Sequence, residues 1–170
     1  AHGVPYVATA SIGHLADLKR KVEKAKALRG LRLITLLIPC LDGWGLADDG
    51  ALTAARYAVE CGAFPLFEIE DGQRYTLNHT QRTRQVADYL ALQRRYRHLS
   101  AEHTRALQAE IDEAWGRLEQ RVAACLEEAG VELGVVRELL GARERRRILG
   151  HGRAQAVEIR LGVEARAAWC

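Results

Sequence analysis

The sequence of 170 residues lacks methionine altogether and contains only three prolines and two phenylalanines. It also lacks any apolar run near the roughly 20 residues that a membrane-spanning helix needs, and no signal-peptide pattern opens it. The four cysteines, Cys40, Cys61, Cys125 and Cys170, are widely spaced and form no C-x-x-C pair. These absences argue against a membrane protein or a disulfide-rich secreted domain, and they favour a cytoplasmic protein with reduced thiols.

The absence of methionine also bears on completeness, because translation starts with that residue. The opening letters AHGVPYVA are typical of a helix end, a Gly-Val-Pro break and a following strand. We therefore expect the chain to be a piece of a longer polypeptide. Its composition, with 48% hydrophobic and 28% charged residues, is that of a globular domain large enough to bury a core.

The first forty residues have the spacing of a βαβ unit. A short apolar run over 5–10 follows proline, and apolar residues then recur at helical spacing from His14 to Leu28. The next run, LRLITLLI at 31–38, is continuously apolar, which is typical of a strand covered on both faces. We therefore expect two parallel strands joined by a right-handed helical crossover.

The remaining pattern predicts three further helices and a hairpin. We expect a helix over about 50–61, a hairpin turning at Asp71-Gly72 in a type I′ turn, and a helix with a basic side over 82–97. A longer helix is predicted after Ser100, a suitable N-cap, with an apolar stripe that includes Trp115. The predicted fold class is thus α/β, a partial parallel sheet with a helical C-terminal extension.

One stretch, LITLLIPCLDGWG at 33–45, suggests a site. In parallel α/β sheets, ligands bind at the carboxyl ends of the strands, and Cys40 comes two residues after such an end. Pro39 restricts the backbone, the nearby glycines allow tight turns, and Trp44 could exclude water. An iron–sulfur ligand needs these properties. A cysteine in this position is nevertheless more often a small buried hydrophobe, and one thiolate cannot hold a cluster that needs four.

The other candidate residues have simpler interpretations. Thr9 and Ser11 follow the first strand at the same sheet edge and could reach a cofactor, although capping the next helix is the preferred role. Five histidines without metal-ligand spacing are assigned to the surface or to helix ends, and Cys61 and Cys125 to core packing; Cys170 receives no role. The histidines are His2, His14, His79, His98 and His103.

Two basic segments raise the question of acidic partners. The Arg-rich stretch at 143–153 has no interleaved aromatic residues, so a solvated basic end is preferred to nucleic-acid binding. The basic helix at 82–97 could meet an acidic electron carrier, but a solvent-facing or subunit-facing helix is the preferred interpretation.

Several blocks in order resemble a known family. YVATASIGHLADLKRKVEKAKALRG, LITLLIPCLDGWG, ALTAARYAVECGAFPLFEIEDGQ and ADYLALQRRYRHL are similar to the carboxyl-terminal half of the β subunits of pyruvate:ferredoxin oxidoreductases, in the 2-oxoacid:ferredoxin oxidoreductase family. The resemblance covers residues 1–100, and IDEAWGRLEQR extends it to about 130. It implies a division into the carboxyl-terminal half of a thiamine-diphosphate-binding domain (1–100), a C-terminal helix (101–130) and a tail of uncertain structure (131–170).

The resemblance implies an activity, cofactors and partners. Such enzymes oxidatively decarboxylate a 2-oxoacid, most often pyruvate, to acyl-coenzyme A, and pass electrons through [4Fe–4S] clusters to ferredoxin. Their β subunit binds thiamine diphosphate and Mg²⁺ and works with an α subunit and with γ and δ partners. By this correspondence, Cys40 is the fourth ligand of the cluster nearest the thiamine.

This sequence also departs from the family pattern. Where the family has P-C-P-T-G-W, the chain has Pro39-Cys40-Leu41-Asp42-Gly43-Trp44, and Asp42 either lowers the cluster's potential or caps the turn. The G-D-G…N segment that binds magnesium and diphosphate is absent, as are the other cluster cysteines. We therefore expect the isolated chain to be inactive and assign no catalytic or thiamine-contacting residue. The alternatives are a noncatalytic subunit-interaction module and an enzyme specific for 2-oxoglutarate, branched-chain 2-oxoacids or indolepyruvate.

Overall fold

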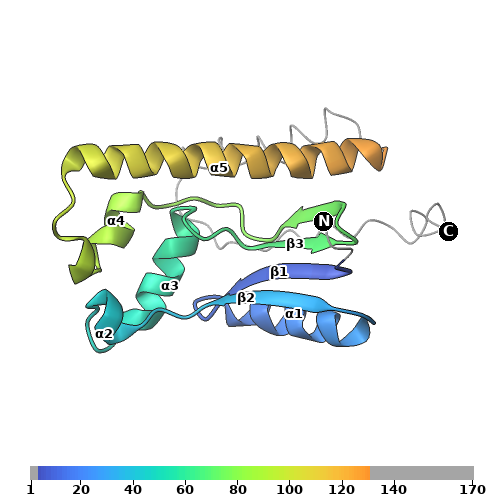
Figure 1. Cartoon of the computed structure of the whole chain (residues 1–170), viewed down its shortest axis with the longest axis horizontal. Coiled ribbons are helices and arrows are strands. Elements are labelled where there is room, and N and C mark those ends of the chain that lie inside the picture. Colours follow the sequence, from blue (N-terminus) through green and yellow to red (C-terminus); the bar gives the residue numbers. More distant parts are fainter. Residues whose placement is uncertain (1–3, 131–170) are drawn as a thin grey trace.

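A computed structural model describes residues 4–130 and shows a mixed four-stranded sheet flanked by helices (Figure 1). The strands lie in the order β2-β1-β3-β4. The elements are β1 (Tyr6–Ser11), α1 (Leu15–Ala27), β2 (Arg32–Leu37), α2 (Leu41–Trp44), α3 (Gly50–Glu60), β3 (Phe67–Glu70), β4 (Arg74–Leu77), α4 (Val86–Ala91), a 3₁₀ turn η1 (Arg94–Tyr96) and α5 (Ala101–Glu128). The predicted α/β class with a C-terminal helical extension is confirmed. The tail at 131–170, with its basic stretch and Cys170, lies outside the described residues, as does His2, and the domain boundaries stay a prediction.

The βαβ unit forms as its spacing predicts. β1 and β2 pair in parallel from Tyr6↔Arg32 to Ser11↔Leu37, and α1 connects them. α1 buries Lys21 and Ala25, whereas Leu15 and Val22, which belong to the predicted apolar stripe, are 64% and 40% exposed. The core between α1 and the sheet consists of Tyr6, Ala8, Ala25, Leu28 and Ile34.

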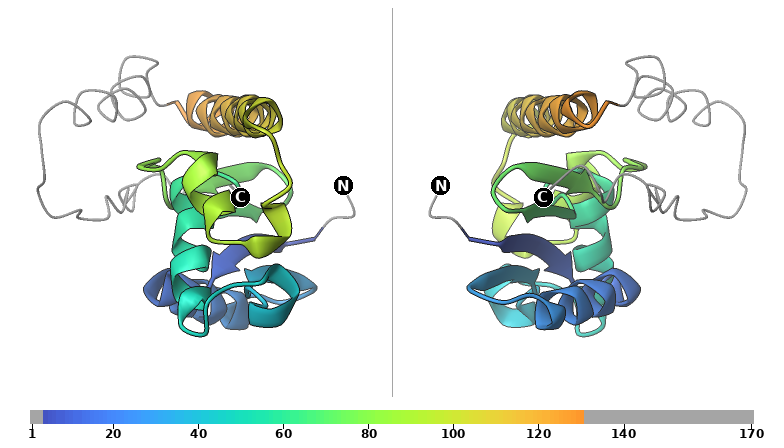
Figure 2. Two further views of the ribbon diagram at one scale, coloured as in Figure 1. Left: turned by 90° about the vertical axis from the view of Figure 1, so that its left-hand side faces the viewer. Right: turned by 90° about the vertical axis from the view of Figure 1, so that its right-hand side faces the viewer.

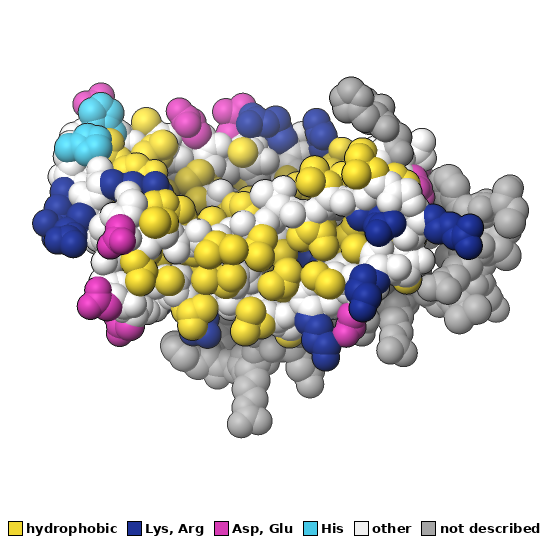
Figure 3. Space-filling view, turned by 60° about the horizontal axis from the view of Figure 1, so that its bottom comes forward, with side chains coloured by type: hydrophobic (Ala, Val, Ile, Leu, Met, Phe, Trp, Pro, Cys, Tyr) yellow, Lys and Arg dark blue, Asp and Glu magenta, His cyan; other side chains and the backbone are white. Residues whose placement is uncertain are grey.

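The prediction that both faces of the second strand are covered is wrong for the residues described. β2 is an edge strand, and Leu33 and Leu36 are 53% and 38% exposed. Figure 1 shows β2 at the side of the sheet opposite to the β3–β4 hairpin. The described part of the chain therefore leaves apolar side chains of β2 exposed, and Figure 3 shows hydrophobic side chains gathered in a band across the face where this edge comes forward.

The predicted hairpin and the helix before it are confirmed. β3 and β4 pair in antiparallel register from Phe67↔Leu77 to Glu70↔Arg74. Asp71 and Gly72 have φ values of 53° and 71°, and a type I′ turn requires positive φ at both central positions. β3 also pairs antiparallel with β1, so the sheet changes from parallel to antiparallel at that strand.

The helix predicted over 82–97 is much shorter in the structure. Before α4, the amides of Thr83 and Arg84 donate to the carbonyl of Glu60 at the end of α3, which holds this segment outside a helix. Gln85 and Asp88 then form a reciprocal capping box that starts α4. Gln93 has extended backbone angles, so η1 follows as a separate turn.

The long C-terminal helix begins where Ser100 predicts. The hydroxyl of Ser100 accepts a hydrogen bond from the amide of His103 at 3.2 Å. α5 runs along the hairpin, on the side of the molecule away from α1, as the two views of Figure 2 show. Trp115 and Val122 are buried on its inner face. Among residues 4–130, we find no helix that combines the length and the apolar character needed to cross a membrane.

Candidate functional site

The turn after β2 holds Cys40 in a defined geometry. Cys40 is exposed, whereas the preceding Pro39 is buried. The Sγ atom of Cys40 accepts a hydrogen bond from the amide of Gly43 at 3.3 Å. The backbone carbonyl of Cys40 accepts one from the amide of Trp44 at 3.1 Å. The turn therefore presents an accessible, oriented sulfur, and the interpretation of Cys40 as a buried packing residue does not fit.

A second segment, η1, supports this turn from the side. The guanidinium carbon of Arg95 lies 4.2 Å from the ring centroid of Trp44 and 4.6 Å from that of Tyr96. The amide of Arg94 donates to the carbonyl of Gly45 at 3.3 Å. Gly45 has a φ of 63°, and a Cβ atom there would lie 2.7 Å from the Cβ of Arg94, so glycine is required. The 40–45 turn is thus fixed from both ends and by a stacked cation.

Two arginines of the segment predicted as a basic helix, Arg82 and Arg84, have partners within the chain. Arg82 stacks on Trp115 with its guanidinium carbon 5.5 Å from the ring centroid, and it pairs with Asp112. Arg84 stacks on Tyr57 at 3.7 Å and pairs with Glu60 at 3.0 Å. These contacts tie Arg82 and Arg84 to the fold.

The two hydroxyl residues at the end of β1 have structural roles. Thr9 Oγ1 donates to the carbonyl of Pro65 at 2.6 Å and accepts from the amide of Phe67 at 3.0 Å. Ser11 Oγ accepts from the amide of Gly13 at 3.2 Å. The predicted capping of the next helix is wrong, because α1 begins after His14 without any side-chain cap. Both hydroxyl groups instead secure the loops that leave the sheet.

Two of the histidines meet, although they lie far apart in the sequence. The rings of His14 and His79 are edge to face with centroids 5.0 Å apart. Burial lowers the pKa of His14, and the neighbouring His79 lowers it further. Its buried Nδ1 has no hydrogen-bond partner among the described residues. His98 and His103 are exposed, as expected.

The other described cysteines differ from one another. Cys61 is fully buried at the end of α3, and its burial raises the pKa of the thiol, so the predicted core role is confirmed. Cys125 is only partly buried, and its Sγ donates to the carbonyl of Gln73 at 2.9 Å. The prediction of core packing is wrong there, because α5 crosses the tip of the hairpin at the edge of the fold. Among residues 4–130, no three His, Cys, Asp or Glu side chains are placed to share a metal ion.

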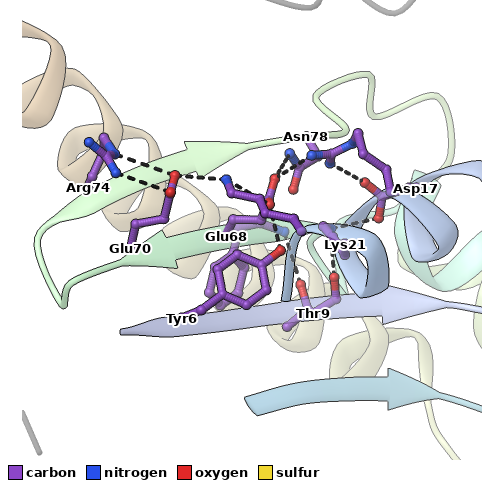
Figure 4. A network of polar contacts seen from close by, with 11 residues as sticks. Tyr6, Thr9, Asp17, Lys21, Glu68, Glu70, Arg74 and Asn78 are labelled. Atoms are coloured by element: carbon purple, nitrogen blue, oxygen red, sulfur yellow. Dashed lines mark hydrogen bonds and ion pairs between the residues drawn. The ribbon is translucent and has the colours of Figure 1, made fainter. Parts of the chain in front are cut away.

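A buried charged network, which sequence spacing did not indicate, joins α1 to the sheet (Figure 4). Glu68 is 1% exposed and accepts hydrogen bonds from Tyr6 at 2.6 Å, Arg20 at 2.9 Å and Asn78 at 2.7 Å. Burial raises the pKa of Glu68, but these donors and the charge of Lys24 outweigh it and lower the pKa to about 2. The carboxylate is therefore ionised and neutralised within the fold.

Lys21 extends this network toward the end of β1. Its Nζ is fully buried and donates to the carbonyl of Thr9 at 2.7 Å and to Asp17 at 2.6 Å. Burial lowers the pKa of Lys21, whereas the carboxylate of Asp17 raises it. Because these charges are paired with one another, we interpret the network as a structural link between α1 and the sheet and not as a general acid–base site.

Comparisons with known proteins place the chain among enzyme subunits. It is 44% identical over 113 residues to the pyruvate synthase subunit PorB of Methanocaldococcus jannaschii, a match that covers 66% of this chain and 38% of that protein. The PorB of Methanothermobacter thermautotrophicus is 46% identical over 113 residues, covering 66% and 39%. The ketoisovalerate oxidoreductase subunit VorB of Pyrococcus furiosus is 37% identical over 123 residues, covering 71% and 39%.

These relatives agree with the family that the sequence resembles. No family model matches the chain. The chain spans about two fifths of the length of the curated relatives it matches. Identities of this size over more than a hundred residues reflect common descent. The chain therefore belongs to the family of 2-oxoacid:ferredoxin oxidoreductase β subunits.

Proposed function

We propose that the chain is part of the β subunit of a cytoplasmic pyruvate:ferredoxin oxidoreductase, which converts a 2-oxoacid, coenzyme A and oxidised ferredoxin to acyl-coenzyme A, CO₂ and reduced ferredoxin. The support is its similarity to B subunits of pyruvate synthase and ketoisovalerate oxidoreductase. Pyruvate is the preferred substrate because the methanogen PorB proteins are the more similar group, and a branched-chain 2-oxoacid is the alternative. The proposed partners are the α, γ and δ subunits.

Within that enzyme, the proposed role of Cys40 is to bind iron of a [4Fe–4S] cluster. One observation supports this role: the sulfur of Cys40 is exposed and accepts a hydrogen bond from the amide of Gly43. This contact lies in a turn that follows a parallel strand. Amide hydrogen bonds to sulfur are among the features that tune cluster potentials. Among residues 4–130, no three His, Cys, Asp or Glu side chains are placed to share a metal ion, so the three further ligands are proposed to come from outside these residues.

The chain's own residues would hold the ligand and control its surroundings. The cluster, when bound, would supply one-electron transfer. Gly43 directs an amide at the sulfur, and Trp44, stacked under Arg95, limits the freedom of the turn and shields one side from water. We assign no residue to thiamine diphosphate or Mg²⁺, because the described polar groups at this sheet edge bond to the fold itself.

The noncatalytic alternative loses its main sequence argument. An apolar stripe on α5 would favour docking of a partner, but Trp115 in that stripe is 5% exposed and packs within the chain under Arg82. Since the matched region covers only part of each relative, we still expect the isolated chain to be inactive. Pyruvate-dependent reduction of a viologen dye by this chain alone would contradict that expectation.

The test of Cys40 needs a complete subunit. The matched portion of Methanocaldococcus jannaschii PorB is replaced by this chain, and the chimera is assembled with the other subunits of that pyruvate synthase. Cys40→Ser should remove the electron paramagnetic resonance signal of one cluster and pyruvate-dependent dye reduction, while Cys125→Ser, the matched control, should change neither. A full cluster signal in Cys40→Ser would refute the ligand role.

A further inference from the structure

The structure brings together two histidines from separate elements at one edge of the sheet. His14 follows β1 and is the N-cap residue of α1, and His79 lies in the loop after β4. Their rings meet edge to face with centroids 5.0 Å apart. β1 and β4 both end at this edge, since each pairs antiparallel with β3. The contact therefore joins the two loops that leave the sheet on either side of β3.

The surroundings of His14 favour a neutral ring. Its buried Nδ1 atom has no hydrogen-bond partner within residues 4–130. In a protonated ring both nitrogens carry a proton, so this nitrogen would become a buried, charged donor without an acceptor. As the N-cap residue, His14 also lies at the positive end of the α1 dipole, where a further positive charge is unfavourable. Burial and the neighbouring His79 accordingly lower the pKa of His14.

The charged groups that face His14 do not remove this penalty. They are Asp17 on α1, Arg56 and Glu60 on α3, and His79 in the loop after β4. Both carboxylates already have cationic partners, because Asp17 pairs with two cations of α1 at 2.6 Å and 2.8 Å, and Glu60 pairs with Arg84 at 3.0 Å. The carboxylates therefore offset a proton on His14 only in part, and Arg56 opposes it.

The backbone holds the two sides of the contact with unequal firmness. On the side of His14, a Cβ atom on Gly13 would lie 2.9 Å from a backbone nitrogen of α3, so the chain is pressed against that helix. On the other side, the amides of Asn78 and Thr83 donate to backbone carbonyls and bracket the loop 79–82. Within residues 4–130, the amides of 80–82 donate to no backbone carbonyl. The loop is therefore the side that can move, and side-chain contacts hold it in place.

We propose that the His14–His79 contact is a proton-sensitive latch, which holds the 79–82 loop against the start of α1 at neutral pH and releases it in mildly acidic solution. Histidine is the side chain whose ordinary titration falls in this range. Protonation adds a positive charge to a ring that faces Arg56 and the N-terminus of α1, and separation of the rings lets water reach the buried nitrogen. The latch consists of contacts within this chain, so it is independent of the proposed function.

Amide hydrogen exchange of the full chain at pH 7.5 and pH 5.5 tests the latch. After correction for intrinsic exchange rates, the amides of Asn78 and Thr83 should lose protection by at least about threefold at the lower pH; one proton with an ordinary pKa allows at most about tenfold. The amide of Gln73, at the other end of the hairpin, is the internal control and should not change. His14→Gln should remove this pH dependence, whereas His98→Gln, the exposed matched control, should keep it.

Titration of the histidine ring protons by nuclear magnetic resonance provides the second measurement, which does not require His14→Gln to fold. In the unchanged chain, His14 should titrate below its ordinary pKa of 6.5, and in His79→Gln its pKa should rise toward that value. A midpoint at or above 6.5 in the unchanged chain overturns the proposal, and so does an unaltered midpoint in His79→Gln. Equal pH dependence of exchange at Asn78 and Thr83 in His14→Gln and in the unchanged chain overturns it too.

Discussion

Replacing Glu68 by glutamine should destabilise the fold strongly and in a pH-dependent manner. Glutamine keeps the shape of the side chain but removes the charge that Arg20 and Lys24 neutralise. It also places an amide donor among groups that themselves donate, including the hydroxyl of Tyr6 and the amide of Asn78. Removing one partner from a buried charged network is much costlier than losing an exposed ion pair.

The expected magnitude follows from the pKa of Glu68. A fall from the ordinary value of 4.5 to about 2 on folding corresponds to about 3 kcal/mol, at about 1.4 kcal/mol per pKa unit. Because the pKa of the folded state is the lower one, this stabilisation is complete above pH 4.5 and is lost as the pH falls toward 2. The unchanged chain should therefore lose most of its advantage over Glu68→Gln across that range.

Urea unfolding followed by circular dichroism measures this difference directly. At pH 7, Glu68→Gln should lower the free energy of unfolding by about 3 kcal/mol. The control Glu113→Gln removes an exposed carboxylate that pairs with Arg117, and it should cost less than about 0.5 kcal/mol. A cost below about 1 kcal/mol for Glu68→Gln, or a cost that stays constant between pH 7 and pH 3, would refute the reasoning.

Two further predictions concern the ends of the strands. Because the pKa of His14 is lowered on folding, its contribution to stability is present above the unfolded value of 6.5 and declines as the pH falls below it; urea midpoints at pH 7.5 and 5.5 should differ less in His14→Gln than in the unchanged chain. Arg95→Ala removes the cation stacked on Trp44, which should cost about 1 kcal/mol and speed amide exchange in residues 41–46. Arg95→Lys should keep part of both effects, and equal exchange in all three proteins would show that the stacking does not hold the turn.

Local signals predicted the elements of this fold well where one short-range cause decides the structure. Asp71-Gly72 specified the hairpin turn, and Ser100 specified the start of α5. The prediction of one helix over 82–97 is wrong because the first amides of this segment donate to the carbonyl of Glu60, which is distant in sequence. The exposure of β2 could not be predicted from its apolar residues. Such a run indicates that a strand is normally buried, but it does not show which residues cover it.

The site shows the same division between local and distant causes. The turn around Cys40 was foreseeable, because proline, glycine and cysteine act within six residues. The Arg95 stack on Trp44 and the His14–His79 contact join residues about 50 or more positions apart, and no periodicity announces them. Glu68 was missed for a related reason: a charged residue in an alternating strand looks solvent-facing until its partners on α1 are known.

The two edges of the sheet differ in how far residues 4–130 cover them. At β3, the buried charge of Glu68 is paired, and α5 lies against the hairpin. At β2, the apolar side chains and outward backbone groups are unpaired within residues 4–130. A strand docked there would gain apolar burial and ladder hydrogen bonds together. β4, the other edge strand, has α5 packed against it. Of the two edge strands, β2 is therefore the one with exposed large apolar side chains, and it ends three residues before Cys40.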